Sequence, residues 1–130
     1  MAQHIGALAL VVRDYDEAIA FYVDKVGFTL AGDTDLGGGK RWVTVTPPGA
    51  RETSLLLAKA VTPDQAARIG DQTGGRVFLF LQTDDFAGDF QRLTANGVKF
   101  VRPPRQEPYG WVAVFEDLYG NLWDLLGSNP

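Results

Sequence analysis

The chain has 130 residues, of which 45% are hydrophobic and 22% charged, a mixture typical of one globular domain that folds without a metal or a disulfide. Its sixteen acidic and twelve basic residues give a net charge of -4, and they include no basic cluster that would bind a phosphate backbone, so nucleic acid is not an expected partner. The apolar runs fall far short of the ~20 residues that span a bilayer, and without an export signal or a cysteine the chain is expected to avoid membranes and to reside in the reducing cytoplasm.

The first part of the chain predicts the order strand, helix and three strands. Residues 5–12 form a continuous apolar run that favours a buried strand. A helix is then expected from the N-cap Asp14 to the stop at Gly27, with Glu17 completing a capping box. The remaining strands are expected at residues 28–31, 41–46 and 53–58, and residues 33–39 are expected to form a glycine-rich loop.

The same order recurs about 70 residues later. A linker at residues 61–75 contains a short helix, and a second helix runs from Asp84 or Asp85 to Gly97. The strands expected around this second helix are residues 76–82, 98–102, 111–115 and 122–126, and Pro103 and Pro104 are expected to open a loop through Pro108. These patterns predict an α+β fold of two tandem βαβββ modules, each with a helix on one sheet face and the other face curved around a cavity. Chance recurrence or a simple ferredoxin-like sandwich is the alternative.

Two motifs carry a resemblance to a known family. Residues 12–15, 21–22 and 26–28 surround the first helix, and residues 115–121 form an acidic and glycine-containing turn near the end. With these motifs the chain resembles the glyoxalase/bleomycin-resistance family of the vicinal oxygen chelate superfamily. Leu118 replaces the proline that is common in the family's turn, a change that a type I turn tolerates. The resemblance implies one glyoxalase-like domain over residues 1–130, with module one at about 1–60, a linker at about 61–75 and module two at about 76–130.

The resemblance also implies where a catalytic divalent metal would be held. Enzymes of the superfamily use His or Glu side chains from inward-facing strand positions to bind a metal that polarises substrate oxygens. Those positions are occupied here by Ala7, a residue near Leu55, Phe78 and Asp124. Since Asp124 alone has an oxygen ligand, neither a metal nor another cofactor is expected.

The rest of the composition agrees with this expectation. A catalytic divalent site needs about three protein ligands, whereas the chain has one histidine and no cysteine. Strand alternation points His4 away from the face of Ala7, and a solvated N-terminal side chain is its common state. An all-oxygen site of Asp124, Gln82 and Glu116 remains an alternative, although no spacing motif supports it.

The cavity wall is expected to be mostly apolar, with a few polar groups. With Ala7 and Phe78 pointing inward, strand alternation places Ile5, Ala9 and Val11 on the cavity side in module one and Phe80 with Gln82 in module two. Aromatic side chains would stack on a planar ligand, Arg41 would present a cation, and Asp124 would accept hydrogen bonds from ligand amines. The expected ligand-binding residues are Arg41, Trp42, Phe78, Phe80, Gln82, Tyr109, Trp111 and Asp124.

Structural alternatives exist for three of these residues. Gln82 is equally compatible with a surface position at the end of a strand, and Asp124 with an anchor for neighbouring backbone. Trp111 is also compatible with packing in the core or at a dimer contact. Trp123, next to Asp124, is expected to face the helix instead.

These observations favour a metal-independent protein that binds a small molecule, similar to the antibiotic-sequestering members of the family, and that forms a homodimer. The alternative is a lyase, isomerase or dioxygenase of the glyoxalase type, with a non-standard metal site or with proton transfer by carboxylates. Whether the chain is an enzyme stays open at this point. A third possibility is an interaction module whose cavity is filled by its own side chains.

Overall fold

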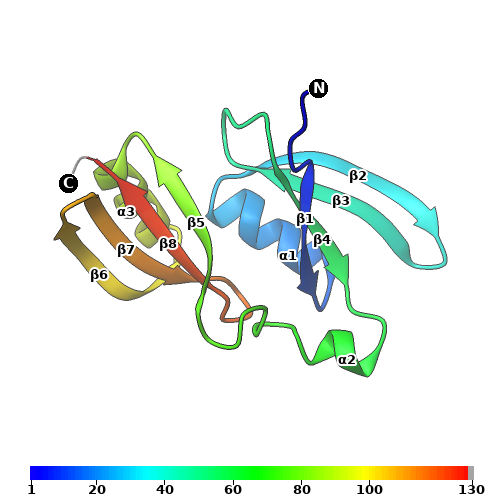
Figure 1. Ribbon diagram of the computed structural model, residues 1–130. Coiled ribbons are helices and arrows are strands. Elements are labelled where there is room, and N and C mark those ends of the chain that lie inside the picture. Colours follow the sequence, from blue (N-terminus) through cyan, green and yellow to red (C-terminus); the bar gives the residue numbers. More distant parts are fainter. Residues whose placement is uncertain (129–130) are drawn as a thin grey trace. The chain divides into compact units, whose positions relative to one another are not determined.

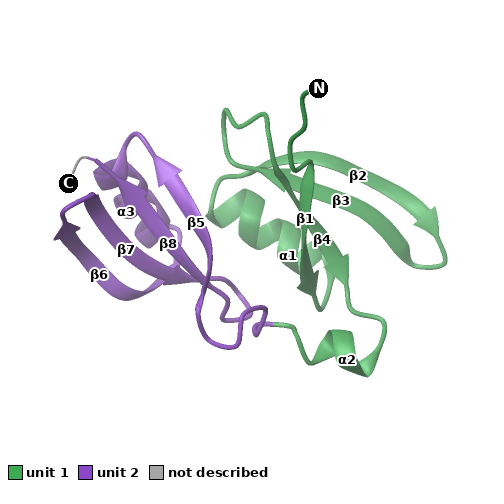
Figure 2. Ribbon diagram, viewed as in Figure 1, with its two compact units in different colours: residues 1–69 green, residues 70–130 purple. Residues whose placement is uncertain are grey.

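The computed structural model describes residues 1–128 and divides the chain into two compact units, one ending at Ile69 and the next beginning at Gly70 (Figure 2). Unit 1 contains the strands β1 (Ala7–Val12), β2 (Thr29–Gly37), β3 (Lys40–Thr46) and β4 (Ser54–Lys59), and the helices α1 (Tyr15–Ile19), η1 (Ala20–Lys25) and α2 (Pro63–Ala66). Unit 2 contains β5 (Val77–Thr83), α3 (Phe86–Ala95), β6 (Lys99–Glu107), β7 (Gly110–Glu116) and β8 (Leu122–Gly127). The predicted α+β class and the repeated βαβββ order are confirmed, and the boundary between the units falls inside the predicted linker (Figure 1).

Each unit has its own four-stranded mixed sheet with the same topology. The strand orders are β1-β4-β3-β2 and β5-β8-β7-β6, and in each sheet the first strand pairs parallel with the last strand of its module. The neighbouring pairs β3–β4, β2–β3, β7–β8 and β6–β7 are antiparallel. The internal repeat seen in the sequence is therefore a repeat of topology.

One face of each sheet is buried under the long helix of its unit. Alternate residues of β1, β3 and β4 form the buried core with α1 and η1, because successive side chains of a strand point to opposite faces. In unit 2 the ring of Trp123 stacks on Phe115, with centroids 5.7 Å apart, on the side of α3. We call the opposite face of each sheet its open face.

The predicted helix starts are largely correct. Asp14, Thr62 and Asp85 each accept a hydrogen bond from the backbone N–H three residues later, which satisfies a donor left free at the start of a helix. Asp85 rather than Asp84 is therefore the cap of α3. The Glu17 carboxylate, expected to complete a capping box at Asp14, also accepts hydrogen bonds from the Arg13 guanidinium at 2.7 and 2.8 Å.

Two predicted loops are strands. The glycine-rich segment 33–39 belongs mostly to β2, which pairs with β3 as far as Gly37 and turns through Gly38 and Gly39. The segment after Arg102, predicted as a loop because of Pro103 and Pro104, belongs to β6 and lies at a shift in the register with β7. Both are edge strands, where prolines and irregular pairing are tolerated.

The acidic turn between β7 and β8 is closed by a buried network. Asp117 and Asn121 are 4% and 3% exposed. The Asp117 carboxylate accepts hydrogen bonds from the backbone N–H groups of Tyr119 and Asn121 and from the Asn121 side-chain amide, each at 2.9 Å. The Gly120 N–H donates to the Asp117 carbonyl at 3.0 Å. Leu118 lies at the turn position where proline is favoured.

Candidate functional site

The open face of unit 2 brings together three of the predicted ligand-binding residues. Phe80 is the register partner of Asp124, and Gln82 is the partner of Leu126, so β5 and β8 present these side chains on one face. The neighbouring residues of β8, Trp123 and Leu125, are buried on the other face. From Phe80 to Gln82, β5 therefore alternates regularly against β8.

A hollow of about 510 Å³ lies along this face, and we call it the unit 2 hollow. Five predicted residues line it: Phe80, Gln82, Tyr109, Trp111 and Asp124. The rings of Phe80 and Tyr109 are 61% and 64% exposed, so both offer stacking surface to a ligand. Their role in binding remains a prediction.

The sequence left open whether Trp111 lines the cavity or packs in the core, and its position is compatible with both. It pairs with Gly127 and follows the alternation of Phe115, which directs it toward α3, and its ring centroid is 6.3 Å from that of the buried Phe86. It is nevertheless half-buried and borders the unit 2 hollow. Trp111 therefore joins the core of α3 to the wall of the hollow.

Phe78 lies outside both main hollows. The register of β5 with β8 shifts between Val77 and Leu79, so Phe78 is the extra residue of a bulge. Val77, opposite Leu122, and Phe80, opposite Asp124, share the open face across this bulge. The bulge makes a strict alternation through residue 78 wrong for this strand. The sequence carries no signal that would have predicted the bulge.

Asp124 is the acidic residue of the unit 2 hollow. Burial raises the pKa of its carboxyl group, and the positive charges of Arg102 and Arg105 partly oppose this effect. Both arginines line a smaller hollow of about 140 Å³ that shares Asp124 and Tyr109 with the larger one. Arg105 also forms an ion pair with Glu107 at 2.6 Å. Asp124 therefore lies where a ligand group that donates a hydrogen bond would find a partly desolvated acceptor.

Unit 1 has a separate hollow of about 640 Å³, which we call the unit 1 hollow. It exists because β3 and β4 pair in register only at Thr44–Leu56 and Val45–Leu55, while the β2–β3 hairpin continues beyond these pairs. Trp42, which is 47% exposed, lines the hollow from β3. The other apolar lining residues include Val11, Leu36, Leu56, Ala58 and Val61.

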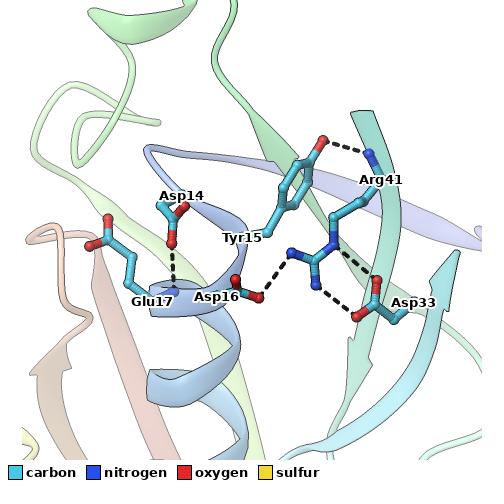
Figure 3. A network of polar contacts seen from close by, with 6 residues as sticks. All are labelled: Asp14, Tyr15, Asp16, Glu17, Asp33 and Arg41. Atoms are coloured by element: carbon cyan, nitrogen blue, oxygen red, sulfur yellow. Dashed lines mark hydrogen bonds and ion pairs between the residues drawn. The ribbon is translucent and has the colours of Figure 1, made fainter. Parts of the chain in front are cut away.

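The Arg41 guanidinium is bound by neighbouring side chains, whereas the sequence suggested that it would present its charge to a ligand. Its guanidinium donates to both carboxylate oxygens of Asp33 at 2.7 and 3.1 Å and to Asp16 at 2.9 Å (Figure 3). It also lies 5.1 Å from the ring centroid of Tyr15, whose hydroxyl accepts a hydrogen bond from the Arg41 backbone N–H at 3.1 Å. The hydrogen bonds from Arg41 lower the pKa of Asp33, and those to Asp33 and Asp16 raise the pKa of Arg41.

This network gives Arg41 a structural role at the border of the hollow. Arg41 alternates with Trp42 and points toward α1, whereas Trp42 points to the open face. Two carboxylates neutralise the guanidinium, and its side chain is 26% exposed. Arg41 therefore fixes the base of the β2–β3 hairpin to α1 and supports the indole beside it.

The side chains present do not fit a divalent metal of the superfamily type. On the open face of unit 1, Ala7 pairs with Ser54 and Ala9 with Leu56, while Leu55 is 6% exposed and points into the core. The metal-ligand position suggested near Leu55 thus corresponds to Leu56 on the open face, and the leucine side chain has no lone pair to bind a metal. Among residues 1–128, no three His, Asp or Glu side chains are grouped as metal ligands.

Comparison with known proteins identifies the family. Residues 4–125 match the sequence model of the Glyoxalase/Bleomycin resistance protein/Dioxygenase superfamily. The chain belongs to this superfamily. A Shewanella frigidimarina protein is 61% identical over 130 residues, which cover 99% of this chain and 96% of the relative.

Solved structures with a similar fold include one antibiotic-binding protein. The crystal structure of UcmS2 has a TM-score of 0.84 and 30% sequence identity, and covers 97% of this chain and 98% of its own. TnmS3, an antibiotic-binding protein from Streptomyces sp. CB03234, has a TM-score of 0.78 and 34% identity, and covers 98% of this chain and 97% of its own. The superfamily thus includes binding proteins as well as enzymes.

Several lining residues had no signal in the sequence. Lys40, Lys59 and Leu36 border the unit 1 hollow because the β2–β3 hairpin separates from β4, and this separation depends on tertiary pairing. Arg102 and Arg105 approach Asp124 because β6 extends past its prolines. Among the described residues, no helix is both long and apolar enough to span a membrane.

Proposed function

We propose that this chain is a binding protein for a planar, largely apolar small molecule, and that it binds this molecule without a metal ion. The observation that carries the proposal is the unit 2 hollow, where exposed aromatic rings surround one partly desolvated carboxylate. Rings of Phe80 and Tyr109 supply stacking area, and Asp124 accepts hydrogen bonds from a ligand amine or hydroxyl. The similarity to TnmS3, an antibiotic-binding protein, gives this proposal independent support.

The absence of suitable ligands supports metal independence. Open-face positions of β1 and β4 carry alanine and leucine, and Asp124 is the carboxylate of the unit 2 hollow. A catalytic divalent site needs about three protein ligands. The described part of the chain groups no such set.

Binding is tested by thermal shift with proflavine, a planar cation, on protein purified without chelators. A ligand that binds only the folded state raises the melting temperature by mass action. Asp124→Asn and Tyr109→Ala are expected to reduce the shift, whereas Asp84→Asn, which removes an exposed charge outside the hollow, leaves it unchanged. A shift that all three variants preserve contradicts binding in this hollow, and stoichiometric metal in the purified protein contradicts metal independence.

An enzyme of the glyoxalase type is the second candidate, and the raised pKa of Asp124 favours it. Burial raises the pKa of this carboxyl group, which moves it toward the range in which a side chain both accepts and donates a proton. Recovery of the bound compound by chromatography separates the two functions, because a binding protein returns it unaltered. An altered product whose formation requires Asp124 supports the enzyme.

We also propose a cytoplasmic homodimer that completes its cavity by pairing. Exposed apolar side chains such as Trp42, Phe80 and Tyr109 favour association, and two-fold pairing is the commonest geometry. Sedimentation velocity measures this directly, and a monomer at micromolar concentration contradicts it.

A further inference from the structure

The unit 1 hollow is lined by cationic side chains although the chain as a whole is acidic. Its lining contains Lys40, Arg41 and Lys59 and no aspartate or glutamate, while the net charge of the chain is -4. Arg41 contributes little to a ligand, because Asp33 and Asp16 already neutralise it. The two lysines are therefore the charges that a ligand in this hollow would meet.

Both lysines are available to a ligand. Lys40 and Lys59 are exposed, and neither forms an ion pair with any residue in the described range 1–128. Lys40 shares one face of β3 with Trp42, two residues along the strand, and Lys59 ends β4 on the other side of the gap between these strands. The hydrated ammonium groups thus border an apolar space from two strands.

The interior of the hollow is apolar and includes one large ring. Leu56, Ala58 and Val11 come from β4 and β1, and the half-exposed indole of Trp42 provides a flat surface. Burial of ligand carbon here would supply most of the affinity, at about 25 cal/mol per Å². The rim lysines would add a preference for charge.

From this arrangement we infer that the unit 1 hollow binds a ring-containing apolar carboxylic acid. The ring stacks on Trp42 and fills the apolar space, and the carboxylate faces Lys40 and Lys59. The inference rests on the proposed binding function, because it specifies the ligand class of one hollow. It distinguishes this hollow from the unit 2 hollow, where Asp124 favours a hydrogen-bond donor.

Three probes with the same ring test the charge preference. 2-Naphthoate, 2-naphthylmethanol and 2-naphthylmethylammonium present an anion, a neutral group and a cation, and calorimetric titration gives their dissociation constants. Each exposed lysine contact is expected to strengthen binding about threefold, so naphthoate should bind roughly tenfold more tightly than the alcohol at low salt. Because exposed charges are screened, 0.5 M salt, where the Debye length is only a few ångströms, should largely remove this difference.

Variants locate the effect in the unit 1 hollow. Lys59→Gln and Lys40→Gln should each weaken naphthoate about threefold and leave the alcohol unchanged. Arg51→Gln is the matched control, because it removes one positive charge from an exposed side chain of unit 1 that does not line the hollow. Trp42→Leu should weaken all three probes. Melting temperatures of the variants verify that each is folded.

The outcomes separate this inference from the proposed function. Equal affinity for the three probes, or equal effects of Lys59→Gln and Arg51→Gln, overturns the carboxylate preference while the binding function stands. Naphthoate binding that depends on Tyr109 and not on Trp42 also overturns it, because the site is then the unit 2 hollow. Failure of every ring compound to bind, proflavine included, overturns both proposals.

Discussion

Replacing Asp117 by alanine removes the group that closes the turn between β7 and β8. The carboxylate accepts three hydrogen bonds of 2.9 Å, from the Tyr119 N–H, the Asn121 N–H and the Asn121 side-chain amide. Asn121 is 3% exposed, so water does not replace the acceptor for its two donors. The half-buried Tyr119 N–H is able to hydrate.

The expected cost follows from counting the donors that stay buried. A buried donor left without an acceptor costs about 1–3 kcal/mol, so the two donors of Asn121 predict a loss of about 2–6 kcal/mol in the free energy of unfolding for Asp117→Ala. Asp117→Asn keeps one oxygen for the backbone donors and loses the acceptor for the side-chain amide, so its predicted cost is about 1–3 kcal/mol. Both values are large against the 5–15 kcal/mol stability typical of a domain.

Urea unfolding followed by tryptophan fluorescence measures both variants, since Trp123 is buried next to this turn in unit 2. The slope of the free energy with denaturant should be unchanged if only the folded state is affected. A loss below about 1 kcal/mol for Asp117→Ala, or equal losses for the two variants, refutes the assignment of the buried network as the cause. Since the turn joins Trp111 on β7 to Asp124 on β8, ligand binding in the unit 2 hollow should also weaken for Asp117→Ala.

Three further predictions concern single side chains. Gly70→Ala should destabilise more than Gly74→Ala, because both glycines have positive φ but only at Gly70 would the new Cβ lie 2.1 Å from a backbone carbonyl oxygen; calorimetric melting temperatures compare them. The pKa of Asp124 is raised in the folded state, so its protonated form stabilises the fold below the ordinary value of 3.8, and this stability is lost as pH rises. Asp124→Asn should therefore have a higher melting temperature than the parent at pH 7 and lose this advantage in acid. For Asp33 the pKa is lowered and the pH dependence is opposite, because its ion pair with Arg41 stabilises the fold above pH 3.8 and is lost as pH falls. The parent should therefore have a higher melting temperature than Asp33→Asn at pH 7 and the same melting temperature in strong acid.

Local signals in the sequence predicted the helix starts and the repeat. Asp14, Thr62 and Asp85 cap helices because a short polar side chain satisfies a nearby backbone donor, an interaction confined to a few residues. The apolar periods of the strands are local in the same sense. These features were sufficient to predict the α+β class and the order of elements.

Strand pairing was less accessible to prediction because it is a tertiary property. Residues 33–37 read as a loop until β3 supplies their hydrogen-bond partners, and Pro103 and Pro104 are compatible with a strand only at an edge. The bulge at Phe78 moved the alternation of β5 by one residue. The first two errors concern pairing with the adjacent strand of a hairpin, whereas the bulge depends on β8, which is distant in the sequence.

Arg41 and Trp42 differ in what alternation says about them. Both line the unit 1 hollow and their role in binding stays a prediction, but as adjacent strand residues they point to opposite faces of the sheet. Trp42 lies on the open face, and Arg41 is bound by Asp33 and Asp16 on the side of α1. A sequence reading that applies alternation separates the two residues but does not identify the carboxylates.

The two modules share a topology, and the difference in pairing that accounts for their different hollows lies between the third and fourth strands of each module. β7 and β8 are paired from Trp111 to Glu116, so the unit 2 hollow is a shallow region of the sheet face around Asp124. β3 and β4 are paired at two positions only, and the gap beyond Thr44 creates the unit 1 hollow beside Lys59. Because a repeat with identical strand order has one hollow with an acidic wall and one with a basic rim, the charge of each hollow depends on strand register and edge residues rather than on the fold that the modules have in common.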